Sequence, residues 1–214
     1  MPAAFKVPPF YPILDTSVLA ERNVLALNMA EVLLEAGAKI LQYRHKQNWT
    51  QTHYEEAERL RSLCAEAGVL FVLNDRADFA HLLGAALHVG QDDLSPVAAR
   101  RIMGDEVMGF STHNKRQLVR ANEEPVEYLS IGPIFPTQSK LKPDPVVGID
   151  GIRTLRPLTK RPLVAIGGIT LANAQEVIDA GANAVAVISG ILPEKCDRKS
   201  LKKRATEWVT LLGG

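Results

Sequence analysis

Residues 69–76, VLFVLNDR, join an apolar run directly to a polar segment. A continuous apolar run without polar alternation is typical of a parallel strand that is covered on both faces. The preceding residues 50–67 repeat apolar side chains at helical spacing, and Gly68 ends that predicted helix. The order of helix, buried strand and polar loop therefore indicates an α/β protein.

The same order recurs along the whole chain with short connections. Strands are predicted at residues 11–14, 39–43, 69–73, 86–89, 106–110, 128–131, 163–166 and 184–188. Helices are predicted between them, with Ser95 and Thr170 as caps, and a last helix at residues 200–212. About eight strand–helix repeats in this order predict a single (β/α)8 TIM barrel.

An open, doubly wound sheet is the alternative architecture. It would need fewer repeats and usually has a glycine-rich dinucleotide turn after its first strand, which residues 15–17 do not supply. No linker or change in composition divides the chain. We therefore expect one domain over residues 1–214, with an N-terminal extension at 1–10 and a closing helical segment at 195–214.

The composition excludes some classes of partner. With 25 basic and 24 acidic residues the net charge is +1, so we expect neither nucleic acid nor a membrane as a partner. No run approaches the roughly 20 apolar residues of a membrane helix, and residues 1–15 do not form a secretory signal. Cys64 and Cys196 fit no metal-binding spacing, which favours reduced thiols in a cytoplasmic protein. A homo-oligomer is left open.

The active site of such a barrel lies at the carboxyl ends of its strands. The residues that follow the predicted strands are rich in charge, amides, hydroxyls and glycine. They are Gln42, Arg44, Lys46, Asn74, Asp75, Gln91, Asp93, Ser111, His113, Thr137, Ser139, Lys140, Gly167, Gly168, Ile188, Ser189 and Gly190.

Asp75 and Asp93 hold matching positions after neighbouring strands. Two carboxylates in a region otherwise rich in cations suggest a Mg²⁺ ion that is shared with phosphate oxygens. The alternative is that each carboxylate pairs with a nearby base, for which Arg76 would be the obvious partner of Asp75.

Arg44, Lys46 and Lys140 would neutralise a polyphosphate in this arrangement, unless Arg44 and Lys46 belong to a solvated loop. The stretch 128–140, YLSIGPIFPTQSK, ends a strand in a loop with hydroxyl groups and a lysine, which suits an anion, although an ordinary turn would look similar. Residues 167–168 and 188–190 could offer backbone N–H groups to a second phosphate, with a tight turn as the alternative for the glycine pair.

Two further groups are less specific. His113 suits either a general acid or base or a helix cap, whereas the other histidines (His45, His53, His81 and His88) are expected to be structural or on the surface. The basic residues around the start of the last helix are interpreted as a solvated face rather than a binding patch. They are Lys195, Arg198, Lys199, Lys202, Lys203 and Arg204.

Seven segments carry a family resemblance in their order and spacing. They are residues 42–46 (QYRHK), 74–76 (NDR), 88–94 (HVGQDDL), 109–111 (GFS), 132–137 (GPIFPT), 165–169 (AIGGI) and 187–189 (VIS). Together they resemble the thiamine-phosphate synthase family over residues 11–191. The resemblance implies a Mg²⁺-dependent transfer of the pyrimidinylmethyl group of hydroxymethylpyrimidine diphosphate to a thiazole phosphate, with release of pyrophosphate and a carbocation-like step.

The resemblance also implies roles for single residues. Arg44, Lys46, Lys140 and Ser111 would be catalytic, and with Gln42 and Asn74 they would bind the pyrimidine diphosphate. Asp75 and Asp93 would hold Mg²⁺. The thiazole phosphate would be bound by Thr137, Ser139, Gly168, Ile188 and Ser189.

The chain departs from the family pattern at Tyr43, His45, Ser139 and Leu14, and the effect of His45 beside the diphosphate site is open. One rival is the related thiazole tautomerase, which would use His113, but the intact Gln91-Asp92-Asp93 favours the synthase. The other is a non-catalytic barrel that binds thiazole phosphate and regulates a partner protein. A metal pair beside three cations argues against that rival.

Overall fold

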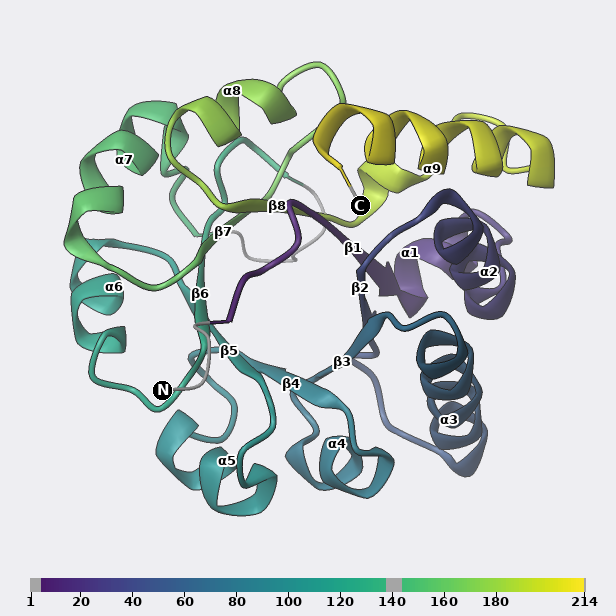
Figure 1. Cartoon of the computed structure of the whole chain (residues 1–214), viewed down its shortest axis with the longest axis horizontal. Helices are drawn as coiled ribbons and strands as arrows, with labels where there is room; N and C mark the ends of the chain where they lie inside the picture. The colour runs from purple at the N-terminus through teal and green to yellow at the C-terminus, as the bar shows by residue number, and fades with distance from the viewer. Residues whose placement is uncertain (1–4, 138–143, 214) are drawn as a thin grey trace.

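The computed structural model describes residues 5–137 and 144–213. Within them, eight parallel strands close into a barrel, because β8 pairs with both β7 and β1 (Figure 1). The strands are β1 (Phe10–Asp15), β2 (Ile40–Arg44), β3 (Leu70–Asn74), β4 (Ala86–Val89), β5 (Met108–Thr112), β6 (Tyr128–Ile131), β7 (Leu163–Ile166) and β8 (Ala184–Val187). The predicted (β/α)8 TIM barrel is confirmed, and the open-sheet alternative is wrong.

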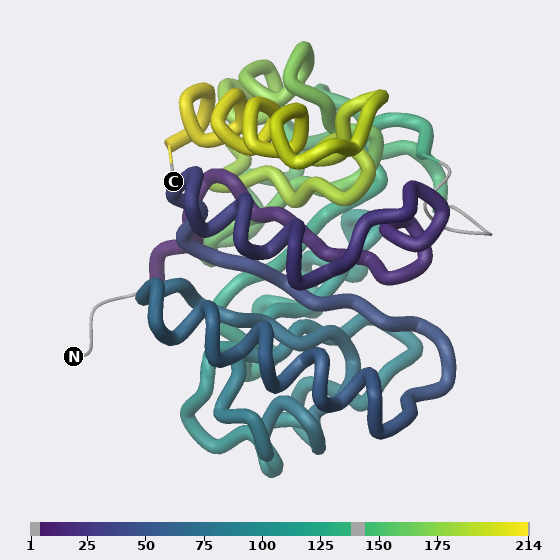
Figure 2. The backbone as a smooth tube through the Cα atoms, turned by 90° about the vertical axis from the view of Figure 1, so that its right-hand side faces the viewer, coloured from purple at the N-terminus to yellow at the C-terminus, as the bar shows by residue number. Residues whose placement is uncertain are grey.

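Helices surround the barrel and cover the outward faces of its strands (Figure 1). They are α1 (Thr16–Glu21), α2 (Ala26–Ala36), α3 (Gln51–Glu66), α4 (Ala77–Leu83), α5 (Pro96–Met103), α6 (Lys115–Ala121), α7 (Gly148–Leu155), α8 (Ala174–Asp179) and α9 (Arg198–Leu212), with 3-10 turns η1 (Arg156–Leu158) and η2 (Ser189–Ile191). Figure 2 shows α2 between α3 and α9. In the described part of the chain, no helix has the length and apolar character needed to cross a membrane.

The strands alternate their side chains between the barrel interior and the helix layer, which is the geometry of any β-strand. In β2, Ile40 packs in the interior cluster, whereas Leu41 and Tyr43 pack against the helices. On β2 to β6 the interior becomes polar toward the carboxyl ends of the strands, whereas β1, β7 and β8 keep apolar side chains there. The polar residues are Gln42, Asn74, His88, Ser111 and Ser130. This division places a hydrophobic base beneath the functional groups.

The segment before β1 closes the amino end of the barrel. Phe5 and Val7 pack on the interior cluster, and the ring centroids of Phe5 and Tyr128 lie 5.9 Å apart. Figure 1 shows this segment crossing the middle of the barrel before β1 begins. The extension predicted for residues 1–10 therefore contributes, over residues 5–9, to the core.

Two helix starts differ from the sequence-based expectation. Helix α1 was not expected, because its six residues are too short to show a periodic pattern. The Asp15 carboxylate caps it by accepting hydrogen bonds from the N–H groups of Ser17 (3.1 Å) and Val18 (3.2 Å). The prediction that Thr170 caps the next-to-last helix is wrong: α8 begins at Ala174, and the Thr170 N–H donates to Asn173 Oδ1 (2.8 Å) in the turn before it.

The basic residues of α9 pair with acidic residues of α2. Arg198 binds Glu31 (3.0 Å) and Glu35 (2.6 Å), and Lys202 binds Glu35 (3.1 Å). These pairs are exposed and contribute little stability each. They agree with the interpretation of this cluster as a solvated face.

Candidate active site

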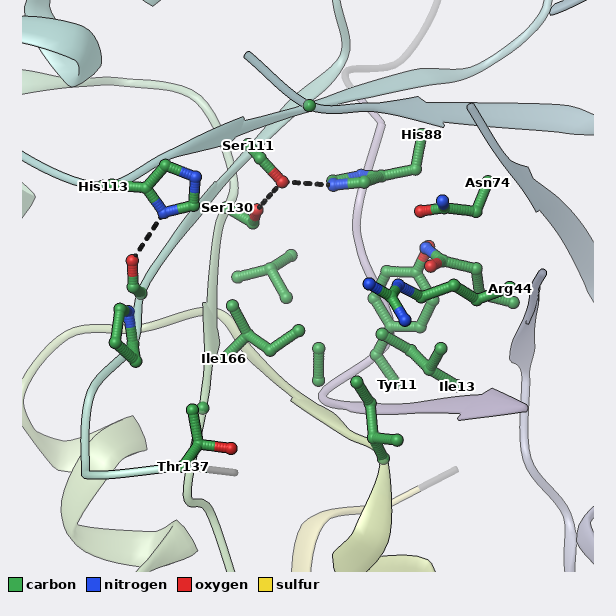
Figure 3. Close-up of a pocket in the computed structure, with 18 of the residues that line it drawn as sticks. Tyr11, Ile13, Arg44, Asn74, His88, Ser111, His113, Ser130, Thr137 and Ile166 are labelled. Carbon is green, nitrogen blue, oxygen red and sulfur yellow. Dashed lines mark hydrogen bonds between the residues drawn. The ribbon is translucent and has the colours of Figure 1, made fainter. Parts of the chain in front are cut away.

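A cavity of about 380 Å³ opens at the carboxyl ends of the strands, within the size range of small-molecule sites (Figure 3). Nearly all predicted site residues within the described ranges line it. They are Gln42, Arg44, Lys46, Asn74, Asp75, Gln91, Asp93, Ser111, His113, Thr137, Gly167, Gly168, Ile188 and Ser189, and Gly190 is the exception. Ser139 and Lys140 lie outside the described residues.

The carboxylates of Asp75 and Asp93 lie together at the ends of β3 and β4, with the Lys46 ammonium between them. Its Nζ atom is 2.5 Å from Asp75 Oδ2 and 4.0 Å from Asp93 Oδ2. The alternative pairing of Asp75 with Arg76 is wrong, because Arg76 binds Asp78 at 2.5 and 2.9 Å. The expected carboxylate pair is therefore present and already holds a cation.

Asp75 reaches this position through an unusual backbone conformation. Its φ is +66°, a left-handed value that non-glycine residues rarely adopt, and its N–H donates to the carbonyl of His88 (2.8 Å). A strained backbone at the end of a barrel strand is common where a side chain must be aimed at a functional site. Here it turns the carboxylate toward Asp93.

The two carboxyl groups titrate differently. Burial raises the pKa of Asp75 to about 6, and the neighbouring Asp93 acts in the same direction. Burial also pushes the pKa of Asp93 upward, but hydrogen bonds from Asp75 and from the Gly90 N–H (2.8 Å) outweigh it, so this pKa is lowered. The charge of Lys46 thus stabilises a pair that would otherwise repel, and below about pH 6 a proton on Asp75 does so as well.

The pair suits Mg²⁺. Carboxylate oxygens are its preferred protein ligands, and it usually takes only one or two of them, with water and phosphate oxygens completing the octahedron. In residues 5–137 and 144–213, no group of three or more acidic, histidine or cysteine side chains could enclose a metal ion. The donor set therefore fits a metal that is shared with a phosphorylated ligand.

Arg44 is held beside the cavity by an ion pair with Asp15. The two residues face each other in the register of β1 and β2, and the other oxygen of the Asp15 carboxylate caps α1. Since Asp15 is only 4% exposed, its charge is well shielded from water. The sequence-based prediction missed Asp15, although its place at a strand end was a usable signal.

Tyr43 and His45 point away from the cavity, as strand alternation requires. The Tyr43 hydroxyl donates to Glu56 of α3 (2.6 Å). His45 Nδ1 bonds to Thr16 Oγ1 (2.8 Å), the ring stacks on His53 at 3.8 Å, and burial lowers the pKa of His45. Neither residue adds positive charge to the cavity.

A chain of buried polar side chains forms the floor of the cavity. Gln42 Nε2 donates to the Tyr11 hydroxyl (2.8 Å), which lies 2.8 Å from the Tyr128 hydroxyl. The Tyr128 oxygen is 3.1 Å from His88 Nδ1, and His88 Nε2 is 2.8 Å from Ser111 Oγ.

Sequence reasoning missed most of this floor. Tyr11 and Tyr128 fall in predicted strands without an expected role at the site, and His88 is expected to be structural or on the surface. The signal that could have found His88 is alternation, because it shares the inward side of β4 with Ala86, one residue before the strand ends.

Asn74 carries an unsatisfied polar group in this floor. Its side chain is 5% exposed, and its amide nitrogen Nδ2 finds no hydrogen-bond partner within the described residues. Buried donors are rarely left unpaired, since the loss costs about 1–3 kcal/mol. The group is therefore positioned to donate to a ligand.

The loops after β6 and β7 pack closely on the opposite side of the cavity. The N–H groups of Ile134 and Phe135 donate to the carbonyls of Ile166 (2.9 Å) and Gly167 (3.0 Å). Gly168 has φ +65°, and a Cβ atom there would lie 2.7 Å from both Phe135 Cβ and the Pro136 carbonyl oxygen. Glycine is therefore required, and its N–H donates to no acceptor among the described residues.

His113 lies at the edge of the cavity. Its Nδ1 is 2.7 Å from the Gly132 carbonyl (Figure 3). The same atom is 3.5 Å from Asp144 Oδ2. A carbonyl accepts only, so Nδ1 carries a proton and Nε2 is the free nitrogen when the ring is neutral. The helix cap that was the alternative is provided by Asn114, whose Oδ1 accepts from the Gln117 N–H (3.0 Å).

Comparisons with known proteins show the family of the chain. Residues 10–191 match the family model described as thiamine monophosphate synthase. A thiamine-phosphate synthase of Koribacter versatilis is 46% identical, with 99% of each chain covered, and one of Chloroflexus aurantiacus is 39% identical over 85% of this chain and 84% of its own. A solved structure of a thiamine phosphate pyrophosphorylase from Pyrococcus furiosus is 31% identical, with a TM-score of 0.80 and coverage of 96% and 97%. The chain therefore belongs to the thiamine-phosphate synthase family.

Proposed function

We propose that this transferase moves the pyrimidinylmethyl group of 4-amino-2-methyl-5-hydroxymethylpyrimidine diphosphate to the ring nitrogen of a (carboxy)thiazole phosphate, forming thiamine phosphate and pyrophosphate. The observation that carries this proposal is the division of the cavity. Cations and carboxylates lie at the ends of β2, β3 and β4, and the glycine-containing loops of β6 to β8 lie across the barrel. One side suits a diphosphate, and the other suits a monophosphate.

The reaction breaks the carbon–oxygen bond to the diphosphate before or as the thiazole nitrogen forms the new bond. The electron pair leaves on the diphosphate oxygen, so the residues must stabilise negative charge there rather than supply a nucleophile. Arg44 and Lys46 are placed for this task, Ser111 can donate a hydrogen bond, and we propose the same role for Lys140. The developing carbocation is shielded from water by the closed floor.

Asp75 and Asp93 would hold Mg²⁺, which would neutralise the diphosphate and make it a better leaving group. The arrangement of Lys46 supports this assignment. Bound between the carboxylates in the free protein, its ammonium can shift to a phosphate oxygen when the metal takes its place. Lys46 would then contribute to the free protein, by pairing with the carboxylates, and to the substrate complex, by binding a phosphate oxygen.

Gln42 and Asn74 would bind the pyrimidine ring. The Gln42 amide donates to Tyr11, which leaves its carbonyl oxygen to accept from the exocyclic amine. The unpaired Nδ2 of Asn74 would donate to a ring nitrogen. The two amides thus match the donor and acceptor pattern of an aminopyrimidine.

The thiazole phosphate would bind to Thr137, Ser139, Gly168, Ile188 and Ser189. This assignment is supported by the unpaired N–H of Gly168 and by the cavity position of the described members of the set. Binding on this side directs the ring nitrogen toward the pyrimidine across the barrel. Orientation of two reactants in this way contributes strongly to catalysis.

The whole chain, residues 1–214, is proposed to act as one catalytic domain, in the cytoplasm. Both cysteines are free, which suits a reducing compartment.

One assay tests the proposal. The purified protein receives both substrates with and without Mg²⁺, and pyrophosphate and thiamine phosphate are measured. Magnesium-dependent formation of both products in equal amounts is expected. Binding of thiazole phosphate without product would instead support the regulatory barrel.

The tautomerase alternative has one supporting observation, the free Nε2 of His113 at the cavity edge. The same assay includes carboxythiazole phosphate alone, followed for isomerisation. Isomerisation that is lost in His113→Ala, without thiamine phosphate synthesis by the parent protein, would replace the synthase assignment.

A further inference from the structure

In each hydrogen bond of the cavity floor, one group donates and the other accepts. Counting the protons that the side chains carry shows which group is the donor. Tyr11 is 1% exposed, and within the described residues its hydroxyl contacts two polar groups, the Gln42 amide and the Tyr128 hydroxyl. Gln42 Nε2 donates to the Tyr11 oxygen. The single proton of Tyr11 must therefore be donated to Tyr128, because a buried hydroxyl proton without an acceptor is costly.

The same assignment of donors and acceptors extends from Tyr128 to His88. With its oxygen accepting from Tyr11, Tyr128 donates its own proton to His88 Nδ1 at 3.1 Å. Because Nδ1 accepts this hydrogen bond, it carries no proton itself, and the imidazole ring is neutral with a single proton. Since Nδ1 accepts, that proton is on Nε2, and it is donated to Ser111 Oγ at 2.8 Å.

The direction matters for what Ser111 can do. When His88 donates to its oxygen, Ser111 keeps its own proton for another acceptor. The present neighbour is Ser130 Oγ at 3.2 Å, longer than the roughly 2.5–3.0 Å of a good hydroxyl–hydroxyl bond (Figure 3). A phosphate oxygen would be a stronger acceptor, since it is charged.

In the opposite tautomer, Ser111 would donate to His88 and present only lone pairs to the cavity. A phosphate oxygen at the same place would then be repelled. The identity of the protonated nitrogen on His88 thus decides whether Ser111 attracts or repels a diphosphate.

We propose that His88 is a positioning residue of the diphosphate site, fixed by Tyr11 and Tyr128 in its Nε2–H tautomer so that the Ser111 hydroxyl donates to the leaving diphosphate. This inference rests on the proposed function for the identity of the ligand. The tautomer itself depends only on the floor.

Gly109 supports the arrangement from the neighbouring strand. It lies opposite Tyr128 in the register of β5 and β6, and a Cβ atom there would be 2.1 Å from Tyr128 Cζ and 2.5 Å from its hydroxyl oxygen. The missing side chain leaves the space in which the Tyr128 hydroxyl reaches His88. The relay of hydrogen bonds that runs from Tyr11 through Tyr128 and His88 to Ser111 therefore requires glycine at position 109.

The first test measures the tautomer directly. Nitrogen-15 spectra of the ring-labelled protein at neutral pH distinguish a protonated from an unprotonated ring nitrogen, and His88→Gln assigns the His88 signals. A neutral ring with the proton on Nε2 is expected, with a mixture of tautomers in Tyr128→Phe. A parent protein with the proton on Nδ1, or a charged ring, would overturn the proposal whatever its activity.

The second test measures turnover. His88→Leu and Ser111→Ala are each expected to lower kcat on the order of 10- to 100-fold, with little change in KM for thiazole phosphate. The double variant should be no worse than Ser111→Ala, because both changes remove one interaction. His88→Gln, whose amide can donate from nearly the same place, should recover most of the loss, and exposed His81→Gln is the matched control.

Additive losses in the double variant would contradict the relay, since His88 would then act independently of Ser111. If His88→Leu does not fold, Tyr128→Phe replaces it, with a smaller loss of kcat expected and an unchanged kcat counting against the proposal. A parent protein that makes no thiamine phosphate would remove the proposed function, while the tautomer measurement would still decide the structural half of the inference.

Discussion

The Nζ atom of Lys46 lies 2.5 Å from the Oδ2 atom of Asp75. The lysine is thus paired with a carboxylate that we propose as a Mg²⁺ ligand, so the two cations would compete for it. Replacing Lys46 with methionine removes this competing cation and keeps the length of the side chain. Mg²⁺ should then bind about 2- to 10-fold more tightly to the free protein, a modest gain because the lysine is 45% exposed, while turnover with both substrates falls. Calorimetric titration and steady-state kinetics measure the two effects.

Lys39→Met is the control for Lys46, because Lys39 is exposed and lies one residue before β2, whereas Lys46 lies two residues after it. Equal metal affinity in the Lys46 variant and the parent would show that the two cations do not compete.

Asp93→Asn should weaken Mg²⁺ binding and raise the Mg²⁺ concentration needed for half-maximal activity. The amide oxygen can still accept from the Gly90 N–H, so the loop should remain in place while one negative charge is lost. Activity should recover partly at high Mg²⁺. Asp92→Asn is the control, an exposed neighbour that lines the same cavity. The same shift in both variants would mean that general charge, rather than the pair, attracts the metal.

His88 should make stability depend on pH. Burial lowers its pKa from 6.5 in the unfolded chain to about 4 in the folded protein, so the unfolded state binds more protons between these values. The free energy of unfolding should therefore fall as pH decreases from 6.5 to 4, by about 3 kcal/mol from this residue. Denaturant titrations across this range measure the slope.

Asp75 acts in the opposite sense in that experiment, because its raised pKa makes the folded state bind a proton between 3.8 and about 6. Comparison with His88→Gln separates the two, since Asp75 is present in both proteins. Parallel curves for parent and variant would show that His88 is not neutral in the folded state.

Asp15→Asn and Asp15→Ala should separate the two roles of this carboxylate. Asparagine can still cap α1 but has no charge for Arg44, so stability should be largely kept and activity reduced. Alanine also removes the cap, at an additional cost of about 0.5–2 kcal/mol. Thermal unfolding and kcat measure the two roles. Asp197→Ala is the control, because this residue caps α9, outside the cavity lining, by accepting from the Ser200 N–H, and should cost stability alone.

Gly168→Ala should raise the KM for thiazole phosphate. The substitution combines an unfavourable φ of +65° with contacts of 2.7 Å to the loop after β6. Gly68→Ala is a matched control, since Gly68 also has φ +65° but no atom within 4 Å of the added methyl group. Both variants should lose stability through the backbone, but only Gly168→Ala should affect KM. A raised KM in both would indicate general destabilisation.

The sequence predicts the barrel well, because each strand is a short apolar run that ends in polar residues, and β4, β6 and β7 have the predicted bounds. It also locates Asp75, Asp93, Arg44 and Lys46, since strand ends meet at one edge of a parallel barrel. These features depend on local pattern and topology, which one sequence carries.

The partners of these residues were harder to predict. Asp15 with Arg44, and Tyr128 with His88, are pairs between strands, and their contacts depend on register and on the space left by Gly109. Tyrosines in an apolar run look like ordinary core, because hydrophobic periodicity does not reveal where a hydroxyl group will find a partner. The α1 helix was missed for a similar reason, since its cap is a contact of Asp15 rather than a periodic pattern.

Tyr128 contacts the cavity floor with its hydroxyl and Phe5 with its ring, 5.9 Å from centroid to centroid. The residues that close the amino end of the barrel therefore contact, through Tyr128, the same network that forms the floor of the cavity. For protein engineering this makes the two ends of the chain unequal. A fusion partner that pulls on residues 5–9 would loosen the aromatic support of the relay, whereas one attached after α9 meets an exposed last turn on the outside of the barrel.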